Sequence, residues 1–511
     1  MSGIAFVGAS RPSIIHPLVR QLVFSLRNLL ANNGSHREKM GGNDTLSPGH
    51  TRTFPTRLIG PFSGRHLLVS GESGGSLFPN RPTMKVSVIG LGYVGLPLSL
   101  QFARSGVEVL GIDIDPAKVE QINNGQSYIQ HIESSTIRAA ISAKHFSATT
   151  DFKRVREVAA VIICVPTPLN KNREPDISYV IKTGEAIAPH LTRGILVVLE
   201  STTYPGTTET NLREVLEKHS GLRAGVDFHL AYSPEREDPG NPNSRVAEIP
   251  KVVGGLTPAC LEKAKAVYSR AIKTLIPVSS CRAAEATKLL ENIFRGVNIA
   301  LVNELKVVYS AMDIDIWEVI HAARTKPFGF MPFYPGPGLG GHCIPIDPFY
   351  LTWKAREYGQ QTRFIELAGE INTAMPEYVV NRVAEALNAQ RKAVNGSRVL
   401  LIGLAYKPDV DDVRESPAFV LMNLLQTRGA QVSYHDPHVP IIRPTREHSH
   451  WAGTISVAWN IETVSQFDAV LICTAHRAVN YKELGAWAGC IIDARNAMAD
   501  VPTKPGQVWK A

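Results

Sequence analysis

The sequence predicts an α/β protein with two Rossmann-like, doubly wound domains joined by a long central helix. Short buried-strand patterns alternate with helical patterns from Met84 onward, and a second alternating set follows residue 395. Between them, residues 282–313 carry one uninterrupted helical pattern. Such alternation is typical of parallel sheets covered by helices. The expected parts are a leader at 1–83, a first domain at 84–281, a central helical domain at 282–394 and a second domain at 395–511.

The composition is that of an ordinary globular protein. The 511 residues are 44% hydrophobic and 20% charged, which suits about three domains. No apolar run reaches membrane-spanning length, so we expect no transmembrane helix and a cytoplasmic location. The six cysteines are far apart, with neither CxxC pairs nor Cys/His metal spacing. This predicts free thiols and no metal site.

The net charge of +8 is concentrated in the leader. The first 83 residues hold nine basic and three acidic residues, so the remaining 428 residues carry only +2. A nearly neutral body does not favour nucleic-acid binding. The leader is rich in Ser, Gly, Pro and Arg, and we favour a disordered or artefactual segment over an organelle-targeting signal. A protein that begins at Met84 is a third interpretation.

A glycine motif follows the first predicted strand, Lys85–Ile89. Residues 90–95, GLGYVG, match G-x-G-x-x-G; a helical pattern follows to Arg104, and the next strand, 107–112, ends at Asp113. In this context the glycines permit a tight turn, the approach of a pyrophosphate and close helix–strand packing, and the acid binds ribose hydroxyls. A carboxylate there would repel a 2′-phosphate, so NAD is favoured over NADP. The predicted cofactor-binding residues are Gly90, Gly92, Tyr93, Val94, Gly95 and Asp113, joined by Thr167 and Thr202 below.

Polar residues follow three more predicted strands of the first domain. The apolar runs 158–165, 194–199 and 228–232 end in Pro-Thr-Pro, Glu-Ser-Thr and Ser-Pro-Glu-Arg clusters. The carboxyl ends of parallel strands share one edge of a sheet, where doubly wound folds bind ligands. Each residue alone could be a cap or turn residue, but three clusters at one edge predict a site. Its members are Thr167, Thr202, Glu235 and Arg236.

The predicted helix 282–313 has two distinct faces. The apolar stripe consists of Leu289, Ile293, Val297, Ala300 and Leu301. The second face carries Glu285, Lys288, Asn292 and Arg295. Lys288 and Asn292 are neighbours because they lie one turn apart. A solvated charged face is one interpretation; because a cysteine-containing loop follows closely, the lining of an active site is the other.

A loop rich in Gly and Pro, residues 333–348, reads FYPGPGLGGHCIPIDP. Its composition excludes a helix interior or a central strand. Cys343 lies in this loop and is followed by an acid, Asp347. The glycines would let the backbone approach a ligand closely, so the loop is suited to present a nucleophile. A buried cysteine in a turn is the alternative.

Helical patterns at 349–358 and 362–389 precede a second α/β unit. Its strands are predicted at 398–402, 431–434, 467–474 and 490–493. Ser416 and the following proline are suited to cap and open a helix. This unit lacks G-x-G-x-x-G, but Lys407 and Arg414 lie near three aspartates in the loop after its first strand. Cations at a strand end suit a phosphorylated ligand; surface ion pairing is the alternative.

Seven motifs together resemble the UDP-glucose/GDP-mannose dehydrogenase family, the nucleotide-sugar dehydrogenases. The motifs are VIGLGYVGLPLSL, CVPTPL, ESTTYPGTT, AYSPEREDPGN, EATKLLENIFRGVNIALVNEL, PGPGLGGHCIPIDP and GLAYKPDVDDVRESPA. They follow the family's order from residue 84 to about residue 496. The resemblance implies an NAD-dependent enzyme that oxidises a sugar C6 alcohol to a carboxylate with two NAD⁺ per sugar. It also implies a homodimer or larger oligomer formed through the long helix, whereas the leader has no counterpart.

The resemblance further implies roles for individual residues. Cys343 would form a thiohemiacetal and then a thioester, and Lys288 and Asn292 would bind the C6 oxygen. Asp347 would orient Lys288 or activate water, and Glu235 would position the hydrolytic water; the general base stays open among Glu235, Asp347 and Lys288. The implied catalytic residues are Cys343, Lys288, Asn292, Asp347, Glu235 and Thr202. The implied substrate-binding residues are Glu235, Arg236, Lys288, Asn292, Arg295, Arg324, Tyr334, Gly338, Gly340, Lys407 and Arg414, with Arg324 reaching a neighbouring subunit.

Two features resemble the family branch that oxidises UDP-N-acetylhexosamines. They are SPEREDPGN at 233–241, and Ile346 where UDP-glucose enzymes usually carry lysine. We expect UDP-N-acetylglucosamine as substrate in surface polysaccharide biosynthesis, with UDP-N-acetylmannosamine or UDP-glucose as alternatives. A 6-phosphogluconate-type dehydrogenase would need neither the thiol nor the second α/β unit. A non-catalytic NAD- or nucleotide-sugar-binding relative would be expected to lack one of the catalytic residues.

Overall fold

The computed structural model describes residues 84–129, 132–170, 173–237, 246–341, 344–445 and 447–511. The predicted leader at 1–83 and the predicted nucleophile Cys343 lie outside the described residues. Residues 84–511 belong to one compact unit that contains two separate, mainly parallel sheets. The predicted α/β class with two doubly wound sheets and a long helix is therefore confirmed.

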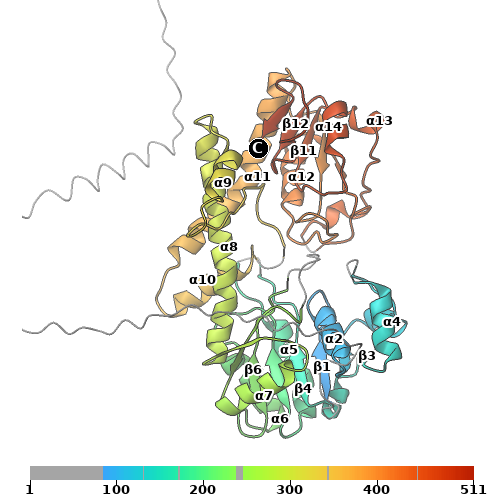
Figure 1. Ribbon diagram of the computed structural model, residues 1–511, viewed down its shortest axis with the longest axis vertical. Coiled ribbons are helices and arrows are strands. Elements are labelled where there is room, and N and C mark those ends of the chain that lie inside the picture. The colour runs from blue at the N-terminus through green and yellow to red at the C-terminus, as the bar shows by residue number, and fades with distance from the viewer. Residues whose placement is uncertain (1–83, 130–131, 171–172, 238–245, 342–343, 446) are drawn as a thin grey trace, which may run out of the picture. The chain divides into compact units, whose positions relative to one another are not determined.

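The first sheet has eight strands in the order β3-β2-β1-β4-β5-β6-β7-β8 (Figure 1). The strands are β1 (Lys85–Ile89), β2 (Glu108–Ile112), β3 (Phe146–Thr149), β4 (Ala160–Ile163), β5 (Leu196–Leu199), β6 (His229–Tyr232), β7 (Lys251–Gly255) and β8 (Leu275–Val278). Neighbours are parallel except β6 and β7, which are antiparallel. The direction of strand succession reverses between β1 and β4, and open α/β sheets bind ligands at such a switch point.

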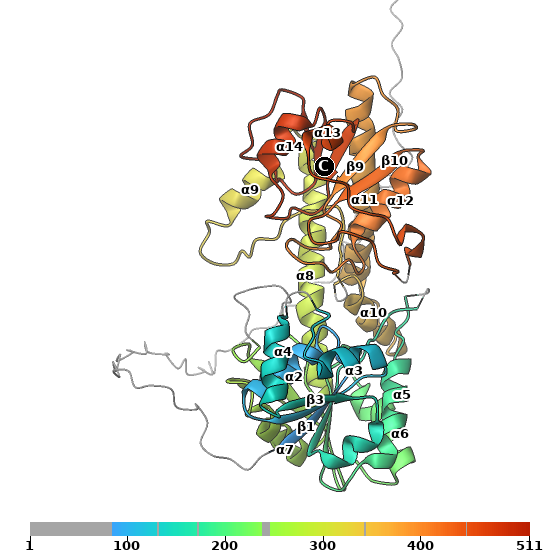
Figure 2. The ribbon, with the colours of Figure 1, turned by 90° about the vertical axis from the view of Figure 1, so that its right-hand side faces the viewer.

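Helices cover both faces of this sheet because each strand is buried on both sides. Val86 and Val88 of β1 face one core, and Ile89 faces the other. The first face is covered by α2 (Gly95–Arg104), α3 (Pro116–Asn123), α4 (Ser134–Ser142) and α7 (Pro258–Tyr268). The second face is covered by α5 (Ser178–Ile187) and α6 (Arg213–Ser220) (Figure 2). Two hydrophobic cores thus hold the turn after β1 rigidly in place.

The predicted long helix is α8, Cys281–Ser310, with Ser280 as its N-cap. The Ser280 side chain accepts a hydrogen bond from the N–H of Ala283. Helix α8 packs on β6 and β7 of the first sheet and also against α10 (Asp347–Glu357) and α11 (Arg363–Ala389). The short α9 (Ile316–Ala323) follows it. The predicted helices at 349–358 and 362–389 are therefore present, but α10 begins earlier, at Asp347.

The second sheet has five parallel strands in the order β10-β9-β11-β12-β13. The strands are β9 (Arg398–Ile402), β10 (Gln431–His435), β11 (Ala469–Ile472), β12 (Ile491–Asp493) and β13 (Val508–Lys510). Helices α11 and α12 (Pro417–Thr427) cover one face, and α13 (Ile461–Val464) and α14 (Tyr481–Trp487) cover the other. The predicted cap of α12 is confirmed, because the Ser416 hydroxyl accepts the N–H of Ala418.

Two predictions from composition can be compared with the described residues. Among them, no helix combines the length and hydropathy needed to cross a lipid bilayer. The five described cysteines are all free thiols, as predicted; they are Cys164, Cys260, Cys281, Cys473 and Cys490.

Candidate active site

The glycine turn after β1 has three glycines with three different surroundings. Gly90 has φ +89°, and a Cβ there would lie 2.5 Å from the carbonyl oxygen of Cys164. A Cβ on Gly95 would lie 1.9 Å from the carbonyl oxygen of Gly90, so this glycine lets α2 pack on the turn. A Cβ on Gly92 would meet nothing within 4 Å. The open side of Gly92, just before the N-terminus of α2, therefore fits the approach of a diphosphate.

Asp113 lies at the end of β2 beside this turn, and it is 6% exposed. Its Oδ2 accepts the N–H of Leu91 at 2.9 Å, and its Oδ1 accepts the N–H of Asp115 at 3.0 Å. Lys118 Nζ lies 3.7 Å from Oδ2. The two oxygens offer more acceptor positions than these bonds use. The carboxylate therefore fits ribose hydroxyls while it also fixes the glycine turn.

The second sheet repeats this arrangement, although it lacks the G-x-G-x-x-G motif. The N–H of Gly403 bonds the carbonyl of His435 at 2.9 Å, as the N–H of Gly90 bonds that of Ile112 at 2.8 Å. Asp436 Oδ2 accepts the N–H of Leu404 at 2.7 Å, as Asp113 accepts that of Leu91. An acid directly after the second strand of each unit was the available signal.

Three predicted polar clusters do lie at one edge of the first sheet, because β4, β5 and β6 are adjacent and parallel. Thr167 Oγ1 donates to the carbonyl of Thr202 at 2.7 Å, which ties the loops after β4 and β5 together. The hydroxyl of Tyr350, on α10, donates to the carbonyl of Thr167. Helix α10, which follows the cysteine loop, is thereby fixed to the sheet edge.

The polar face of α8 is mostly buried rather than solvated. Glu285, Lys288 and Asn292 are buried, whereas Arg295 is exposed. Glu285 accepts N–H groups from Gly206 and Thr208, and burial raises the pKa of Glu285 to about 7. Glu285 therefore anchors the loop after β5, and the face turns toward the site only at Lys288 and Asn292.

Four of the predicted catalytic residues come together around α8. Lys288 Nζ donates to the carbonyl oxygen of Glu235. Asn292 Nδ2 donates to Asp347 Oδ2 at 2.5 Å. Burial raises the pKa of Asp347 to about 7, against the opposing effects of the Lys288 charge and the Asn292 hydrogen bond. These contacts form a buried polar cluster beside the segment that carries Cys343.

The glycine-rich loop packs closely against the second α/β unit. A Cβ on Gly340 would lie 2.7 Å from Tyr406 Cβ, and one on Gly336 would lie 2.3 Å from Arg495 Nη1. The N–H of Gly341 donates to the carbonyl of Arg414 at 3.1 Å. Protein groups therefore occupy the space beside these glycines, whose small size permits contact between the loop and the second unit.

A cavity of about 810 Å³ lies beside residues 344–348, immediately after Cys343. Of the predicted substrate-binding residues, Gly338 and Arg414 line it. Its other walls include the loop after β4, helices α8, α10, α11 and α12, and residues 443–445, 447 and 448. Its size and mainly apolar lining suit a ligand of nucleotide-sugar size.

Four other predicted substrate-binding residues lie in different environments. Arg236 pairs with Glu291 at 2.6 Å, so its guanidinium is already used within the protein. Arg324 is exposed at the end of α9, and Arg295 is exposed on α8. Tyr334 is 37% exposed and stacks on Trp317, with the ring centroids 5.6 Å apart.

The loop after β9 brings Arg414 to the glycine turn of the first sheet. Arg414 bonds both carboxylate oxygens of Asp412, and its guanidinium lies 4.5 Å from the ring centroid of Tyr93. Burial raises the pKa of Tyr93 to about 12. Lys407 Nζ lies 5.8 Å from the ring centroid of Tyr406. A predicted substrate residue and a predicted cofactor residue are therefore in direct contact.

A buried group of charges behind Glu235 was also missed. Lys251, at the start of β7, lies near Glu200 and Glu235, and Tyr268 bonds Glu200. The lysine at the start of the buried run 251–255 was the feature of the sequence that could have indicated a buried ion pair.

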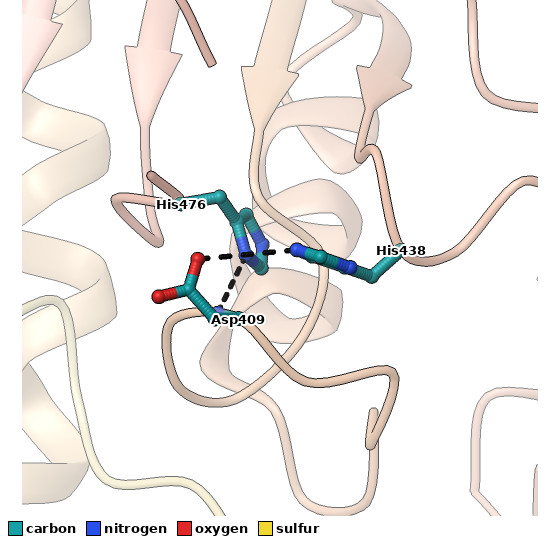
Figure 3. Close-up of side chains that lie close together, drawn as sticks. All are labelled: Asp409, His438 and His476. Carbon is teal, nitrogen blue, oxygen red and sulfur yellow. Dashed lines mark hydrogen bonds and ion pairs between the residues drawn. The ribbon is translucent and has the colours of Figure 1, made fainter. Parts of the chain in front are cut away.

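Asp409, His438 and His476 lie close together in the second unit, in the spacing of a metal site (Figure 3). His476 Nδ1 accepts the N–H of Asp409 at 3.0 Å, so Nε2 carries the proton and donates to Asp436 Oδ2 at 3.0 Å. Asp409 also binds Arg477. Since both ring nitrogens of His476 are engaged, this cluster holds the loop after β9 and offers a metal ion no free His476 nitrogen.

Comparison with known families places the chain. Three models match: the NAD binding domain of the UDP-glucose/GDP-mannose dehydrogenase family at residues 84–272, its central domain at 282–374 and its UDP binding domain at 400–500. The chain belongs to the UDP-glucose/GDP-mannose dehydrogenase family. It is an NAD-dependent nucleotide-sugar dehydrogenase, with an NAD-binding domain built on the first sheet and a UDP-binding domain built on the second.

Relatives within this family are named for different substrates. The chain is 36% identical over 404 residues to UDP-N-acetyl-D-glucosamine 6-dehydrogenase of Pseudomonas aeruginosa, which covers 79% of this chain and 92% of that enzyme. It is 37% identical over 365 residues to NDP-N-acetyl-D-galactosaminuronic acid dehydrogenase of Ralstonia nicotianae, and the match covers 70% of this chain and 84% of that enzyme. The structure of UDP-D-ManNAc dehydrogenase from Pyrococcus horikoshii matches with a TM-score of 0.74 and 33% identity, covering 82% and 97%.

Proposed function

We propose that this dehydrogenase oxidises the C6 alcohol of a UDP-N-acetylhexosamine to a carboxylate, with UDP-N-acetylglucosamine as the favoured sugar. The observation that carries the proposal is the buried cluster in which Lys288 and Asn292 meet Glu235 and Asp347 beside the segment of Cys343. A non-catalytic relative would have no reason to keep this set together. The reaction would supply a uronic acid for surface polysaccharide biosynthesis, in the cytoplasm, where thiols stay reduced.

Bound NAD⁺ supplies the hydride acceptor for both oxidations. The residues that would hold it are those of the turn after β1 and Asp113, since Gly92 leaves open space there and Asp113 offers free acceptor positions. Thr167 and Thr202 lie at the same sheet edge. We place the nicotinamide near these threonines.

Cys343 explains how the aldehyde is retained between the two oxidations. Its thiolate adds to the aldehyde carbon and forms a thiohemiacetal, which loses a hydride and a proton to become a thioester. Water then attacks the thioester carbonyl, the carbon–sulfur bond breaks, and the carboxylate product leaves. The thiolate is regenerated, and two hydrides have been removed per sugar.

Lys288 and Asn292 provide the donors that this chemistry needs. Both are buried on one turn of α8, where hydrogen bonds to developing oxyanions are strong. Asp347, beside them, has a pKa near neutrality and can exchange a proton with the C6 oxygen or with water. We assign the positioning of hydrolytic water to Glu235, whose backbone oxygen binds Lys288.

The choice of sugar rests on the cysteine loop and on relatives. Ile346 takes the position where UDP-glucose enzymes of the family usually carry lysine, and the relative from Pseudomonas aeruginosa is named for UDP-N-acetyl-D-glucosamine. UDP-N-acetylmannosamine is the second candidate, because a dehydrogenase from Pyrococcus horikoshii named for that sugar is 34% identical over 426 residues.

We also propose a homodimer or larger oligomer formed through α8. Four residues, Leu290, Phe294, Leu301 and Val308, lie along one side of this helix and are 46–67% exposed. Four large apolar side chains at helical spacing on an exposed face are costly in water and suit a second copy of the same face. Arg324, exposed near this region of the chain, stays our candidate for reaching a neighbouring subunit's substrate.

The substrate is tested by supplying NAD⁺ with UDP-N-acetylglucosamine, UDP-N-acetylmannosamine, UDP-N-acetylgalactosamine and UDP-glucose in separate reactions. We expect the highest kcat/KM with UDP-N-acetylglucosamine and a uronic acid product by mass spectrometry. A higher kcat/KM with UDP-glucose would overturn the proposed branch. No NADH with any of the four would overturn the proposed substrate class.

A further inference from the structure

A buried lysine lies directly behind the Glu235 carboxylate. Lys251 Nζ is 3.0 Å from Glu200 Oε2 and 3.7 Å from Glu235 Oε2. The exposed fractions of the three side chains are 7% for Lys251, 0% for Glu200 and 15% for Glu235. One cation therefore serves two carboxylates inside the protein.

The sheet itself brings Lys251 and Glu235 together. Strands β6 and β7 are antiparallel, with Ala231 opposite Gly255 and Tyr232 opposite Gly254. Continuing this register places residue 235 opposite residue 251. The Ser233 hydroxyl extends the pairing, because it donates to the carbonyl of Val252 at 2.8 Å. The position of Lys251 relative to Glu235 is thus set by the only antiparallel pair among the described strands of the first sheet.

Glu200 and Tyr268 complete the surroundings of Lys251. The Tyr268 hydroxyl donates to Glu200 Oε1, and Lys251 Nζ lies 5.1 Å from the Tyr268 ring centroid. Burial raises the pKa of Glu200, against the effect of the Lys251 charge. Without that cation, the Glu200 and Glu235 carboxylates would face each other with no positive charge between them, which is unfavourable inside a protein.

All three oxygens of Glu235 have protein partners. Its Oε1 accepts the N–H groups of Arg236 at 2.8 Å and of Glu237 at 2.5 Å. Its Oε2 faces Lys251, and its backbone oxygen accepts from Lys288. Lys251 is therefore the side chain that holds the second carboxylate oxygen, while the catalytic lysine holds the backbone of the same residue.

We propose that Lys251 is a positioning residue that orients the Glu235 carboxylate for hydrolysis of the Cys343 thioester. The inference rests on the function proposed above. In that step a water oxygen bonds to the thioester carbon, a water proton passes to the Glu235 carboxylate, and the carbon–sulfur bond breaks to release thiolate and sugar acid. Lys251 itself contacts neither substrate nor cofactor.

The test compares four variants of the full chain: Lys251→Met, Lys251→Arg, the double variant Glu200→Gln/Lys251→Met, and Lys273→Met. The last is a matched control, because Lys273 also pairs with a glutamate, Glu248 at 3.2 Å, but is exposed. Each is mixed with NAD⁺ and UDP-N-acetylglucosamine, or with whichever UDP-sugar the wild type oxidises best. NADH is followed through the first turnover, and the mass of the intact protein is then measured.

We expect Lys251→Met to form two NADH per active site in the first turnover, to slow at least tenfold afterwards and to retain the mass of a covalently bound sugar acid. Lys251→Arg should recover most of the turnover, and Lys273→Met should match the wild type. The double variant replaces the buried ion pair by neutral groups of similar size, yet it should still retain the adduct because Glu235 lacks its cation.

Recovery of full turnover in the double variant would overturn the proposal, since Lys251 would then serve only to neutralise Glu200. Loss of the first-turnover NADH in a folded Lys251→Met protein would also overturn it. If Lys251→Met does not fold, the double variant tests the proposal: a retained adduct would support it, and absence of the adduct would overturn it. Failure of the wild type to form two NADH per sugar would instead refute the proposed function, and the role of Lys251 with it.

Discussion

Asn292 and Asp347 are separated by 55 residues in the chain, and the Asn292 amide donates to the Asp347 carboxylate at 2.5 Å. Asn292 lies within α8 and Asp347 opens α10, and the two side chains are 5% and 2% exposed. The bond fixes the end of the cysteine loop against the long helix. Three residues, 344–346, separate Asp347 from Cys343 in the chain.

The pKa of Asp347 gives the first prediction. Burial raises it to about 7, against about 3.9 for an aspartate in an unfolded chain. Between these values the folded state holds a proton that the unfolded state has released, so this group's effect on stability becomes less favourable as pH rises from about 4 to about 7 and is constant above that. Asp347→Asn should therefore raise the free energy of unfolding at pH 8 by about 2 kcal/mol and change little at pH 4.5.

Urea denaturation at the two pH values measures this difference, with Glu262→Gln as a control at an exposed acid that pairs with Lys265. A gain that is the same at both pH values would mean that Asp347 is ionised throughout.

The glycine turn gives a matched pair of variants. Gly95→Ala places a Cβ 1.9 Å from a backbone oxygen, so we expect a loss of stability of about 2 kcal/mol or more. Gly92→Ala meets no protein atom within 4 Å, so its melting temperature should stay near that of the wild type. Its methyl group instead projects into the space left for the diphosphate. Calorimetry with NAD⁺ should show roughly tenfold weaker binding, and unchanged NAD⁺ affinity would show that the cofactor passes elsewhere.

Tyr93 and Arg414 link the two binding domains. A cation over an aromatic ring contributes about 0.5–2 kcal/mol, so Tyr93→Leu should weaken UDP binding by roughly 2- to 30-fold. Tyr93→Phe should retain the affinity, because the ring remains under the guanidinium at 4.5 Å. Titration calorimetry with UDP compares the two variants. Equal affinities would indicate that Arg414 is held by Asp412 alone.

The exposed side of α8 predicts self-association. Phe294→Asp and Leu301→Asp place charges on a face where both side chains are about half exposed, at 48% and 52%. A charge buried in an apolar interface is strongly unfavourable, so each variant should dissociate at micromolar concentration in sedimentation velocity. Val226→Asp, at a side chain that is 67% exposed elsewhere, should not. A wild type that sediments as a monomer would refute the proposed oligomer.

Local chemistry explains which parts could be predicted from the sequence. The turn at 90–95, the strands on either side of it and the neighbours Lys288 and Asn292 follow from spacing along one element. The contact between Asn292 and Asp347 depends on how α10 packs on α8, and spacing carries no information on that. Strand β8 was missed because it is partly exposed and contains Pro277, and β7 because it begins with Lys251. A charged residue is rarely buried in a strand, so a lysine in the sequence disfavours a buried strand unless the residues that pair with the lysine are known.

The surroundings of the loop glycines also depend on packing between distant parts of the chain. Gly336, Gly340 and Gly341 were expected to admit a ligand, because glycine permits close approach. On the side where a Cβ would lie, the groups that approach these glycines are Tyr406 and Arg495. The sequence shows that a position requires a small residue, whereas only the packing of the second unit shows what occupies the space.

The central claim is a four-electron oxidation through Cys343. The most direct test is the ratio of NADH formed to UDP-N-acetylglucosamine consumed, measured for the wild type, for Cys343→Ser and for Cys490→Ser as a control at a buried thiol of the second sheet. We predict two NADH per sugar for the wild type and for the control, and no uronic acid from Cys343→Ser. A ratio of one in the wild type, or a ratio of two with full turnover in Cys343→Ser, would contradict the account.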